Sequence, residues 1–295
     1  MKNKVALFYN PVAGGGKFKL RLDDVFHQLQ KCGLQAVPWR ITPDQSLDGP
    51  MLSINPDEYH SVAVAGGDGT VNIVVNAMAR NQIDIPLAII PAGTCNDLAA
   101  YLGIPSDLKK CCDLIAKGSA KPIDLGSVNN RYFVNVAAAG FLTNTAHEAD
   151  YYLKNVLGKL AYYMKGIEKI PQMKSLQIEL NVDGQSTQFE AILFLVLNGG
   201  VAGGFLGLSP ETRIDDGRLD FLAIKSMPLP KLAQVFYYLK KDSCLLKDST
   251  IRFSGEKFTI KALPQVTTDL DGEKGPDLPW HISVHPRAIH CYSVT

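Results

Sequence analysis

The sequence predicts two domains, an α/β domain over residues 1–125 and a mainly antiparallel β-sandwich over residues 126–295. In the first stretch, short apolar runs alternate with segments of helical spacing, which is typical of a mostly parallel sheet covered on both faces. In the second stretch, strand-like segments follow one another with turn residues between them. The last few residues can return to the first domain.

The elements of the first domain follow in order along the chain. Buried apolar runs predict strands at 5–9, 34–41, 61–65 and 87–90. A helix is predicted over 17–32, because apolar side chains recur there at helical spacing. A second helix is predicted over 105–117, since Pro105 suits a helix start and Gly118 suits the position after a helix end.

The second domain begins near residue 125, where the pattern changes. Strands are predicted at 131–139, 175–182, 188–197, 219–224, 257–261 and 281–284. Asp183-Gly184 is a hairpin signal between two of these strands. Two helical patterns, 147–170 and 228–242, mix Lys and Tyr with apolar residues, which suits an anionic membrane interface. Packing against the protein's own core is the preferred explanation of the apolar stripe itself.

Composition excludes several classes of function. The chain has 295 residues, of which 46% are hydrophobic and 20% charged, as in a soluble globular protein. A net charge of +1 argues against nucleic acid as a partner. No apolar run is long enough to cross a bilayer, so any membrane contact is peripheral. The six cysteines form no CxxC pair, which predicts reduced thiols in a cytoplasmic protein without a zinc site. Oligomeric state stays open, and a homodimer is one option.

The most informative motif is Gly66-Gly67-Asp68-Gly69-Thr70, which lies between a strand pattern and a helix pattern. Such a turn directs backbone N–H groups and the positive end of a helix dipole at one point, which suits a phosphate. The glycines let the backbone approach the anion closely. Asp68 cannot bind phosphate directly, so it is expected to hold a metal ion or to orient a neighbouring group. A plain strand-to-helix turn is the alternative.

Polar clusters follow four predicted strands of the first domain. They are Asn10–Lys17, Thr42, Gly66–Asn72 and Pro91–Asp97. In an open α/β sheet, ligands bind beyond the carboxyl ends of the strands, so we expect these clusters to converge there. The first cluster lacks the spacing of a Walker loop. In the last cluster, Thr94 and Asn96 are also good helix caps, and capping is the competing interpretation.

The second domain carries two acidic turns. Asp215-Asp216-Gly217 offers carboxylate oxygens that suit Mg²⁺ or Ca²⁺, although Asp-Gly is also common in surface turns. The second turn, 269–273, contains Asp271 and Glu273, and a carboxylate beside a phosphate donor can take a proton from an attacking hydroxyl. A solvated surface turn is the alternative for it.

Taken in order, these motifs resemble the diacylglycerol kinase catalytic-domain family, in particular its soluble bacterial lipid kinases, which are similar to sphingosine and ceramide kinases. The motifs are Asn10-Pro11, Gly66–Asn72, Pro91–Asp97, Asp215-Asp216-Gly217 and Asp271-Gly272-Glu273. The resemblance covers essentially the whole chain. It implies a Rossmann-like first domain of the NAD-kinase and diacylglycerol-kinase type, followed by the β-sandwich.

The resemblance also implies an ATP-dependent, Mg²⁺-dependent lipid kinase that works at the membrane surface, with its nucleotide between the two domains. The implied nucleotide-binding residues are Asn10, Pro11, Val12, Ala13, Gly14, Thr42, Gly66, Gly67, Asp68, Gly69, Thr70, Val71, Asn72 and Thr94.

By the same resemblance, Glu273 is the general base on the lipid hydroxyl, with Asp271 beside it in a supporting or metal-binding role. Asp68 helps to hold the catalytic Mg²⁺ and the phosphates. A second, structural Mg²⁺ site comprises Asp216 and the main-chain carbonyls of Arg213 and Arg218.

Two alternatives stay open from the sequence. An NAD kinase has a similar fold and glycine turn, although Asn10-Pro11, Pro91–Asp97 and Asp271–Glu273 favour the lipid kinase. A non-catalytic lipid-binding protein on the same scaffold is the other. Two departures from the family pattern keep the non-catalytic alternative open: Ala100 stands where the family commonly has an arginine, and Thr42 is followed by Pro43-Asp44-Gln45. The sequence does not identify the lipid, and diacylglycerol, ceramide, sphingosine-like bases, phosphatidylglycerol and undecaprenol all fit.

Overall fold

The computed structural model describes residues 2–42, 45–140, 175–199, 201–202, 205–206, 213–227 and 248–294. The chain divides into two compact units. Unit 1 comprises Met1–Ile123 together with Arg287–Thr295, and unit 2 comprises Asp124–Pro286. The predicted helical patterns at 147–170 and 228–242 lie outside the described residues. Within the part that is described, none of the helices combines the length and the apolar character needed to cross a bilayer.

Unit 1 is built on a parallel sheet in the strand order β2-β1-β3-β4-β17. Its strands are β1 (Lys4–Tyr9), β2 (Gln35–Arg40), β3 (Tyr59–Gly66), β4 (Leu87–Pro91) and the last part of β17 (Trp280–Tyr292). The middle strands are apolar and buried along most of their length, as a sheet covered on both faces requires. The carboxyl ends of β1 to β4 therefore meet at one edge of the sheet.

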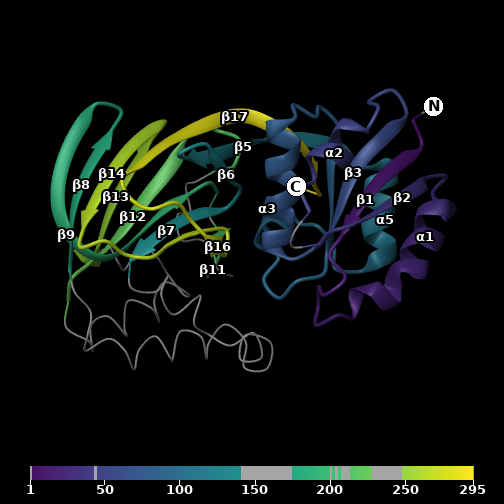
Figure 1. Cartoon of the computed structure of the whole chain (residues 1–295), viewed down its shortest axis with the longest axis horizontal. Helices are drawn as coiled ribbons and strands as arrows, with labels where there is room; N and C mark the ends of the chain where they lie inside the picture. The colour runs from purple at the N-terminus through teal and green to yellow at the C-terminus, as the bar shows by residue number, and fades with distance from the viewer. Residues whose placement is uncertain are drawn as a thin grey trace. The chain divides into compact units, whose positions relative to one another are not determined.

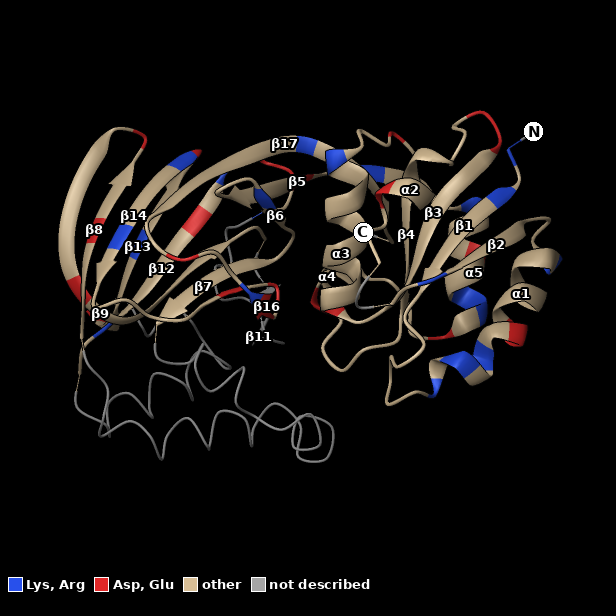
Figure 2. Ribbon diagram, viewed as in Figure 1, with Lys and Arg blue, Asp and Glu red and all other residues tan. Residues whose placement is uncertain are grey.

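Helices cover both faces of this sheet (Figure 1). α1 (Leu22–Lys31) and α5 (Leu108–Lys117) lie together on one face, and α3 (Asp68–Arg80) with α2 (Asp48–Leu52) lies on the other. A short helix, α4 (Asp97–Tyr101), follows β4. Lys, Arg, Asp and Glu lie along α1 and α5, while the strands between the helix layers carry few charges (Figure 2). The predicted α/β class of the first domain is confirmed.

Two predicted helices of unit 1 start later than the sequence pattern indicates. The pattern over 17–32 divides into a 3₁₀ turn, η1 (Phe18–Arg21), and then α1, which begins at Leu22. The helix predicted from residue 105 begins at Leu108, because the Asp107 side chain caps it by accepting the N–H of Lys110 at 2.9 Å. Gly118 follows the end of that helix as predicted.

Unit 2 consists of strands that pair mainly antiparallel. They are β5 (Ala120–Val128), which begins in unit 1, β6 (Arg131–Phe133), β7 (Val136–Gly140), β8 (Leu176–Val182), β9 (Gln185–Leu197), β10 (Val201–Ala202), β11 (Phe205–Leu206), β12 (Leu219–Lys225), β13 (Thr250–Gly255), β14 (Lys257–Leu263), β15 (Thr268–Leu270), β16 (Glu273–Lys274) and the first part of β17.

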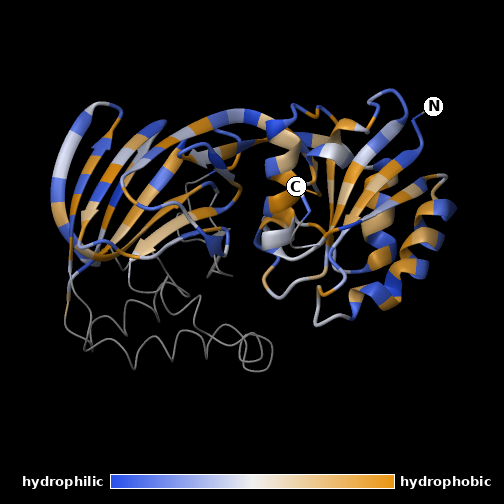
Figure 3. Cartoon of the chain, viewed as in Figure 1, coloured by the Kyte–Doolittle hydropathy of each residue, from blue (hydrophilic) through white to orange (hydrophobic). Residues whose placement is uncertain are grey.

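One strand organises the core of unit 2. The first half of β9 pairs with β8, and its second half lies between β7 and β12. Buried and exposed residues alternate along β8, as the bands of hydropathy in Figure 3 show, so one face of the strand points to the core. In that core, the ring of Phe194 packs against those of Phe221 and Trp280, with centroids 5.7 and 5.6 Å away. The predicted antiparallel β-sandwich is confirmed.

The turn between β8 and β9 is the one predicted from Asp183-Gly184. Both residues have positive φ, at 50° and 92°, as a two-residue hairpin loop of this type requires. The single strand predicted over 131–139 is divided into β6 and β7. β13 was not predicted at all, although it pairs with β12 along its full length.

Candidate functional site

Three loops of unit 1 meet at the carboxyl edge of its sheet. The Asn10 backbone N–H donates to the Ala65 carbonyl at 3.0 Å, and its side-chain Nδ2 donates to Thr70 Oγ1 at 3.2 Å. The Ala92 N–H donates to the Gly66 carbonyl at 3.0 Å. The segments after β1, β3 and β4, which the sequence predicts to converge, are thus in direct contact. Thr42 follows β2 at the same edge, with its Oγ1 3.4 Å from Gln45 Oε1.

Glycines make this close contact geometrically feasible. A Cβ atom on Gly66 would lie 2.4 Å from Thr70 Cβ, so no larger residue fits without a shift of the helix start. Gly14 has φ +61°, and a Cβ there would lie 3.1 Å from the Ala92 carbonyl oxygen. The loop after β1 therefore requires glycine both for its backbone conformation and for its approach to the loop after β4.

The N-terminus of α3 lies at this edge. Its N-cap residue, Gly67, has no side chain with which to cap the helix. The first N–H groups of an α-helix have no partner within the helix, and together with the helix dipole they favour an anion. Val71 and Asn72 are 4% and 7% exposed, so these two predicted site residues lie in the core face of α3. Val12, in contrast, is 61% exposed.

Asp68 uses its carboxylate to bind the neighbouring loop. Its Oδ2 accepts the backbone N–H of Asn96 at 2.8 Å, and its Oδ1 accepts that of Asp97 at 2.6 Å. These two N–H groups begin α4, so Asp68 caps that helix from another part of the chain. The capping role considered for Thr94 and Asn96 is thus filled by Asp68, since the Asn96 side chain makes no capping bond to α4.

In unit 2, Asp271 is buried and holds a backbone segment. Its carboxylate accepts the N–H groups of Val134 at 2.6 Å, Asn135 at 2.9 Å and Val136 at 2.8 Å. These bonds lie where β6 ends and β7 begins, and they account for the break in the strand predicted over 131–139. Asp271 as a whole residue is 5% exposed, and the three bonds give its carboxylate a structural role.

Glu273 lies two residues after Asp271 and is the first residue of β16, directly after the tight turn that joins β15 to β16. Asp271 and Gly272 form the two-residue loop with φ of 51° and 92°, and Asp269 Oδ1 accepts the Gly272 N–H at 2.8 Å. Glu273 itself is exposed. The turn therefore fixes the backbone of Glu273 while its carboxylate stays accessible to a reactant.

The other acidic turn of unit 2 is organised around backbone groups. Asp216 Oδ1 accepts the Arg218 N–H at 2.9 Å, and the buried Asp124 accepts the Gly217 N–H at 2.6 Å. Arg213 pairs instead with Asp215, at 3.0 and 3.1 Å. Burial raises the pKa of Asp216, and the neighbouring carboxylates of Asp220 and Asp124 add to this effect. A cation would relieve that excess of negative charge.

Asn198 connects the two acidic turns through the backbone. Its Nδ2 donates to the carbonyl of Asp124 at 2.7 Å and to that of Val134 at 2.8 Å, and the residue is 1% exposed. Neither Asn198 nor Asp124 was predicted from the sequence as a site residue. Each is an isolated polar residue beside apolar neighbours, so no local pattern distinguishes it.

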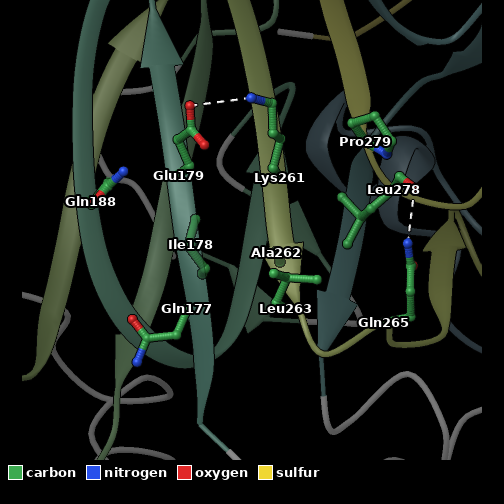
Figure 4. Close-up of a pocket in the computed structure, with 10 residues that line it drawn as sticks. All are labelled: Gln177, Ile178, Glu179, Gln188, Lys261, Ala262, Leu263, Gln265, Leu278 and Pro279. Atoms are coloured by element: carbon green, nitrogen blue, oxygen red, sulfur yellow. Dashed lines mark hydrogen bonds and ion pairs between the residues drawn. The ribbon is translucent and has the colours of Figure 1, made fainter.

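A separate hollow lies on the outer face of unit 2, over β8 and β14 (Figure 4). The Glu179 and Lys261 side chains pair across it at 3.2 Å, and Gln265 Nε2 donates to the Leu278 carbonyl at 3.2 Å. None of the predicted site residues lines it.

No metal cluster stands out among the residues that the structure describes. Across those ranges, no group of three His, Cys, Asp or Glu side chains is arranged to hold an ion. Mg²⁺ is commonly held by one or two carboxylates with water and substrate phosphates completing its shell. Asp68 and Asp216 are compatible with that sparse type of site, because each carboxylate oxygen can accept a second contact.

Comparisons with known proteins match both parts of the chain. The model of the diacylglycerol kinase catalytic domain matches residues 4–128, and the model of the YegS C-terminal NAD kinase beta sandwich-like domain matches residues 135–293. The diacylglycerol kinase of Bacillus subtilis (strain 168) is 33% identical over 288 residues, covering 97% of this chain and 95% of the relative. That of Staphylococcus carnosus is 32% identical over 279 residues, covering 95% and 91%.

Solved structures agree with these matches. A putative diacylglycerol kinase from Bacillus anthracis str. Sterne superimposes with a TM-score of 0.85 at 28% identity, covering 99% of this chain and 96% of that one. A second structure of a diacylglycerol kinase from the same source gives a TM-score of 0.81 at 27% identity, covering 99% and 97%.

Proposed function

This chain belongs to the diacylglycerol kinase catalytic domain family and is a phosphotransferase with an alcohol acceptor, and from this premise we propose that it transfers the γ-phosphate of ATP to a lipid hydroxyl, with diacylglycerol as the first candidate. The observation that carries the proposal is the contact among the three loops at the carboxyl edge of unit 1. Those loops bring backbone donors, a helix N-terminus and hydroxyl groups to one place, as phosphoryl transfer requires.

In the proposed mechanism, unit 1 binds the nucleotide chiefly through its backbone. The first-turn N–H groups of α3 and the glycine-rich loop 10–14 receive the phosphates, while Thr42 and Thr94 add hydroxyl groups. The backbone is suited to this role because its donors are already fixed by the contacts between loops, so little reorganisation accompanies transfer. Mg²⁺, when bound, neutralises charge on the phosphates, and Asp68 is the residue we assign to it at this edge.

A second, structural Mg²⁺ site is proposed in the acidic turn of unit 2. Asp216 and the main-chain carbonyls of Arg213 and Arg218 would supply its protein ligands. The raised pKa of Asp216 is compatible with this assignment, because burial and, to a smaller extent, the carboxylates of Asp220 and Asp124 disfavour its charged form, and a bound cation would favour that form.

Glu273 is the proposed general base on the acceptor hydroxyl. Its exposed carboxylate would accept the hydroxyl proton as the oxygen attacks the γ-phosphorus and the bond to the β–γ bridging oxygen breaks, which releases ADP. Asp271 supports it indirectly, since its three bonds to residues 134–136 hold the turn that presents Glu273. Neither Glu273 nor Asp271 is assigned a role in nucleotide binding, so the proposal separates binding from catalysis experimentally.

The variant Glu273→Gln tests this role. We expect kcat to fall by about 10² or more, the usual scale for a general base, while the affinity for ATP stays unchanged. Glu256→Gln is a matched control, because Glu256 is also an exposed glutamate of unit 2 and has no assigned role. Turnover in Glu273→Gln equal to that of the control would remove Glu273 from the mechanism.

The acceptor is identified by measuring ATP consumption in mixed micelles against a panel of lipids. The panel contains diacylglycerol, ceramide, sphingosine, phosphatidylglycerol and undecaprenol. NAD is assayed beside them as the soluble acceptor that an NAD kinase would use. Product from diacylglycerol supports the proposal. Product from NAD alone would contradict it, and no ATP consumption with any acceptor would favour the non-catalytic alternative.

A lipid acceptor requires contact with a membrane surface, and we propose that this contact is peripheral. If basic and aromatic side chains make it, binding to vesicles should increase with anionic lipid content and decrease with added salt. Sedimentation with vesicles of increasing phosphatidylglycerol content measures both dependences. Binding that responds to neither would argue against an anionic interface.

A further inference from the structure

Two loops at the carboxyl edge of unit 1 touch backbone to backbone. A Cβ atom on Gly93 would lie only 2.3 Å from the Cα of Gly67, and one on Gly67 would lie 3.1 Å from the Cα of Gly93. The first loop contains the start of α3, and the second runs from β4 to the start of α4. At such a distance, a small shift of either loop changes the geometry of both.

The side chain of Asn96 closes the second loop on itself. Its Nδ2 donates to the Gly93 carbonyl at 2.9 Å, and its Oδ1 accepts the Gly93 N–H at 2.9 Å. One amide thus satisfies both peptide groups of the glycine that touches Gly67. Among side chains of this length, only asparagine offers a donor and an acceptor together.

The backbone of Asn96 is bound by the first loop. Asn96 has φ +53°, in the left-handed region, which turns its N–H toward the carboxylate of Asp68 at 2.8 Å. Asparagine tolerates this region better than most residues. Asn96 therefore connects the two loops at two levels, through its N–H to Asp68 and through its side chain to Gly93.

We infer that Asn96 is a positioning residue for nucleotide binding, which acts by holding Gly93 against Gly67 and so fixes the distance between the α3 N-terminus and Thr94. This inference rests on the proposed function. Asn96 need not touch the nucleotide, and its effect is on the geometry of the groups that do. Loss of its two side-chain bonds would increase the population of displaced loops by roughly 5- to 150-fold.

Asn96→Gly isolates the side chain, because glycine adopts the same backbone conformation without strain. Asn129→Gly is a matched control. Asn129 also has positive φ, 46°, and its side chain also binds two backbone groups, the Pro279 carbonyl at 3.1 Å and the His281 N–H at 2.9 Å, but it lies in unit 2. Both variants lose the same kind of bonds.

We expect Asn96→Gly to weaken ADP binding, measured by calorimetry, by about tenfold, and Asn129→Gly to leave it unchanged. In the kinase assay, the KM for ATP should rise in Asn96→Gly more than kcat falls. Equal affinities for ADP in the two glycine variants would overturn the inference.

Amide hydrogen exchange without ligand keeps the inference independent of the proposed function. The N–H groups of Gly93, residue 96 and Asp97 should exchange faster in Asn96→Gly than in the wild type and in Asn129→Gly. Unchanged exchange at these positions would refute the inference. If the wild type bound no nucleotide, the proposed function would fail, while the exchange result would still decide whether Asn96 holds the loops.

Discussion

The Asp271 carboxylate offers a sharp test of how unit 2 presents its acidic turn. Its three backbone partners are Val134, Asn135 and Val136, of which Val134 and Asn135 are 1% and 5% exposed. Asp271→Ala leaves these donors without an acceptor. Each unsatisfied buried donor costs about 1–3 kcal/mol, so the three together would cost about 3–9 kcal/mol.

The expected loss for Asp271→Ala is in the lower half of that range, about 3–5 kcal/mol, because Val136 is only half-buried and can shift toward water. Asp271→Asn should lose less, about 1–3 kcal/mol. A single amide oxygen can replace Oδ1, which accepts two of the three N–H groups, and only Val134 is then left facing a donor.

Urea unfolding followed by tryptophan fluorescence measures the free energy of unfolding of unit 2. The chain has two tryptophans, so Trp39→Phe leaves Trp280, which is fully buried in unit 2, as the only reporter. Asp277→Ala is the control, since Asp277 is an exposed aspartate close by in the chain, and surface changes stay within about 0.5 kcal/mol. A free energy for Asp271→Ala within about 1 kcal/mol of that control would refute the reasoning.

Three further outcomes are expected. Burial lowers the pKa of His285 in the folded protein below its ordinary value of 6.5. As the pH falls below 6.5, the unfolded chain therefore binds a proton at this histidine before the folded chain does, and unit 2 should lose stability. A melting temperature for His285→Asn with the same pH dependence as the wild type would contradict this. Burial raises the pKa of Cys111 to about 12, so its thiol should resist iodoacetamide in the folded protein, and mass spectrometry showing labelling as fast as after unfolding would contradict this. Gly93→Ala places a Cβ 2.3 Å from Gly67 Cα and should weaken nucleotide binding at least tenfold, whereas Gly49→Ala, with open space around it, should not; equal affinities would refute the close contact.

The strands β1 to β4 of unit 1 could be predicted from the sequence within about two residues, because a buried parallel strand is apolar on both faces and is recognisable as an uninterrupted run. The last part of β17 was not predicted, since the expected strand ended at residue 284. The helix starts were less accurate. The pattern beginning at Lys17 includes a 3₁₀ turn, and the cap at Asp107 moves the start of α5 past Pro105. At Asp107 the cap, and not the apolar spacing, determines where the helix begins.

The candidate site was predictable only as a set of loops. Parallel topology implies that loops after successive strands share an edge, and the Asn10–Thr70 bond is consistent with that. The partners of Asp68 are 28 and 29 residues away, and those of Asp271 are 135 to 137 residues away. No local sequence pattern contains such pairs, so the anchoring roles of both carboxylates could be identified only from the three-dimensional structure.

The return of Arg287–Thr295 to unit 1 has a consequence for synthesis on the ribosome. Cys291 pairs with Leu87 and is fully buried, and the Val294 N–H donates to the Leu102 carbonyl at 3.0 Å. While these residues are still in the exit tunnel, β4 presents an open edge, and every residue of unit 2 has already been translated. Folding in order of synthesis, which is usual for consecutive domains, is therefore reversed for the last step. Nascent chains that stall at Pro286 would expose the edge of β4 to pairing with strands of other chains. The rate at which such stalled chains are degraded is a measure of this aggregation risk.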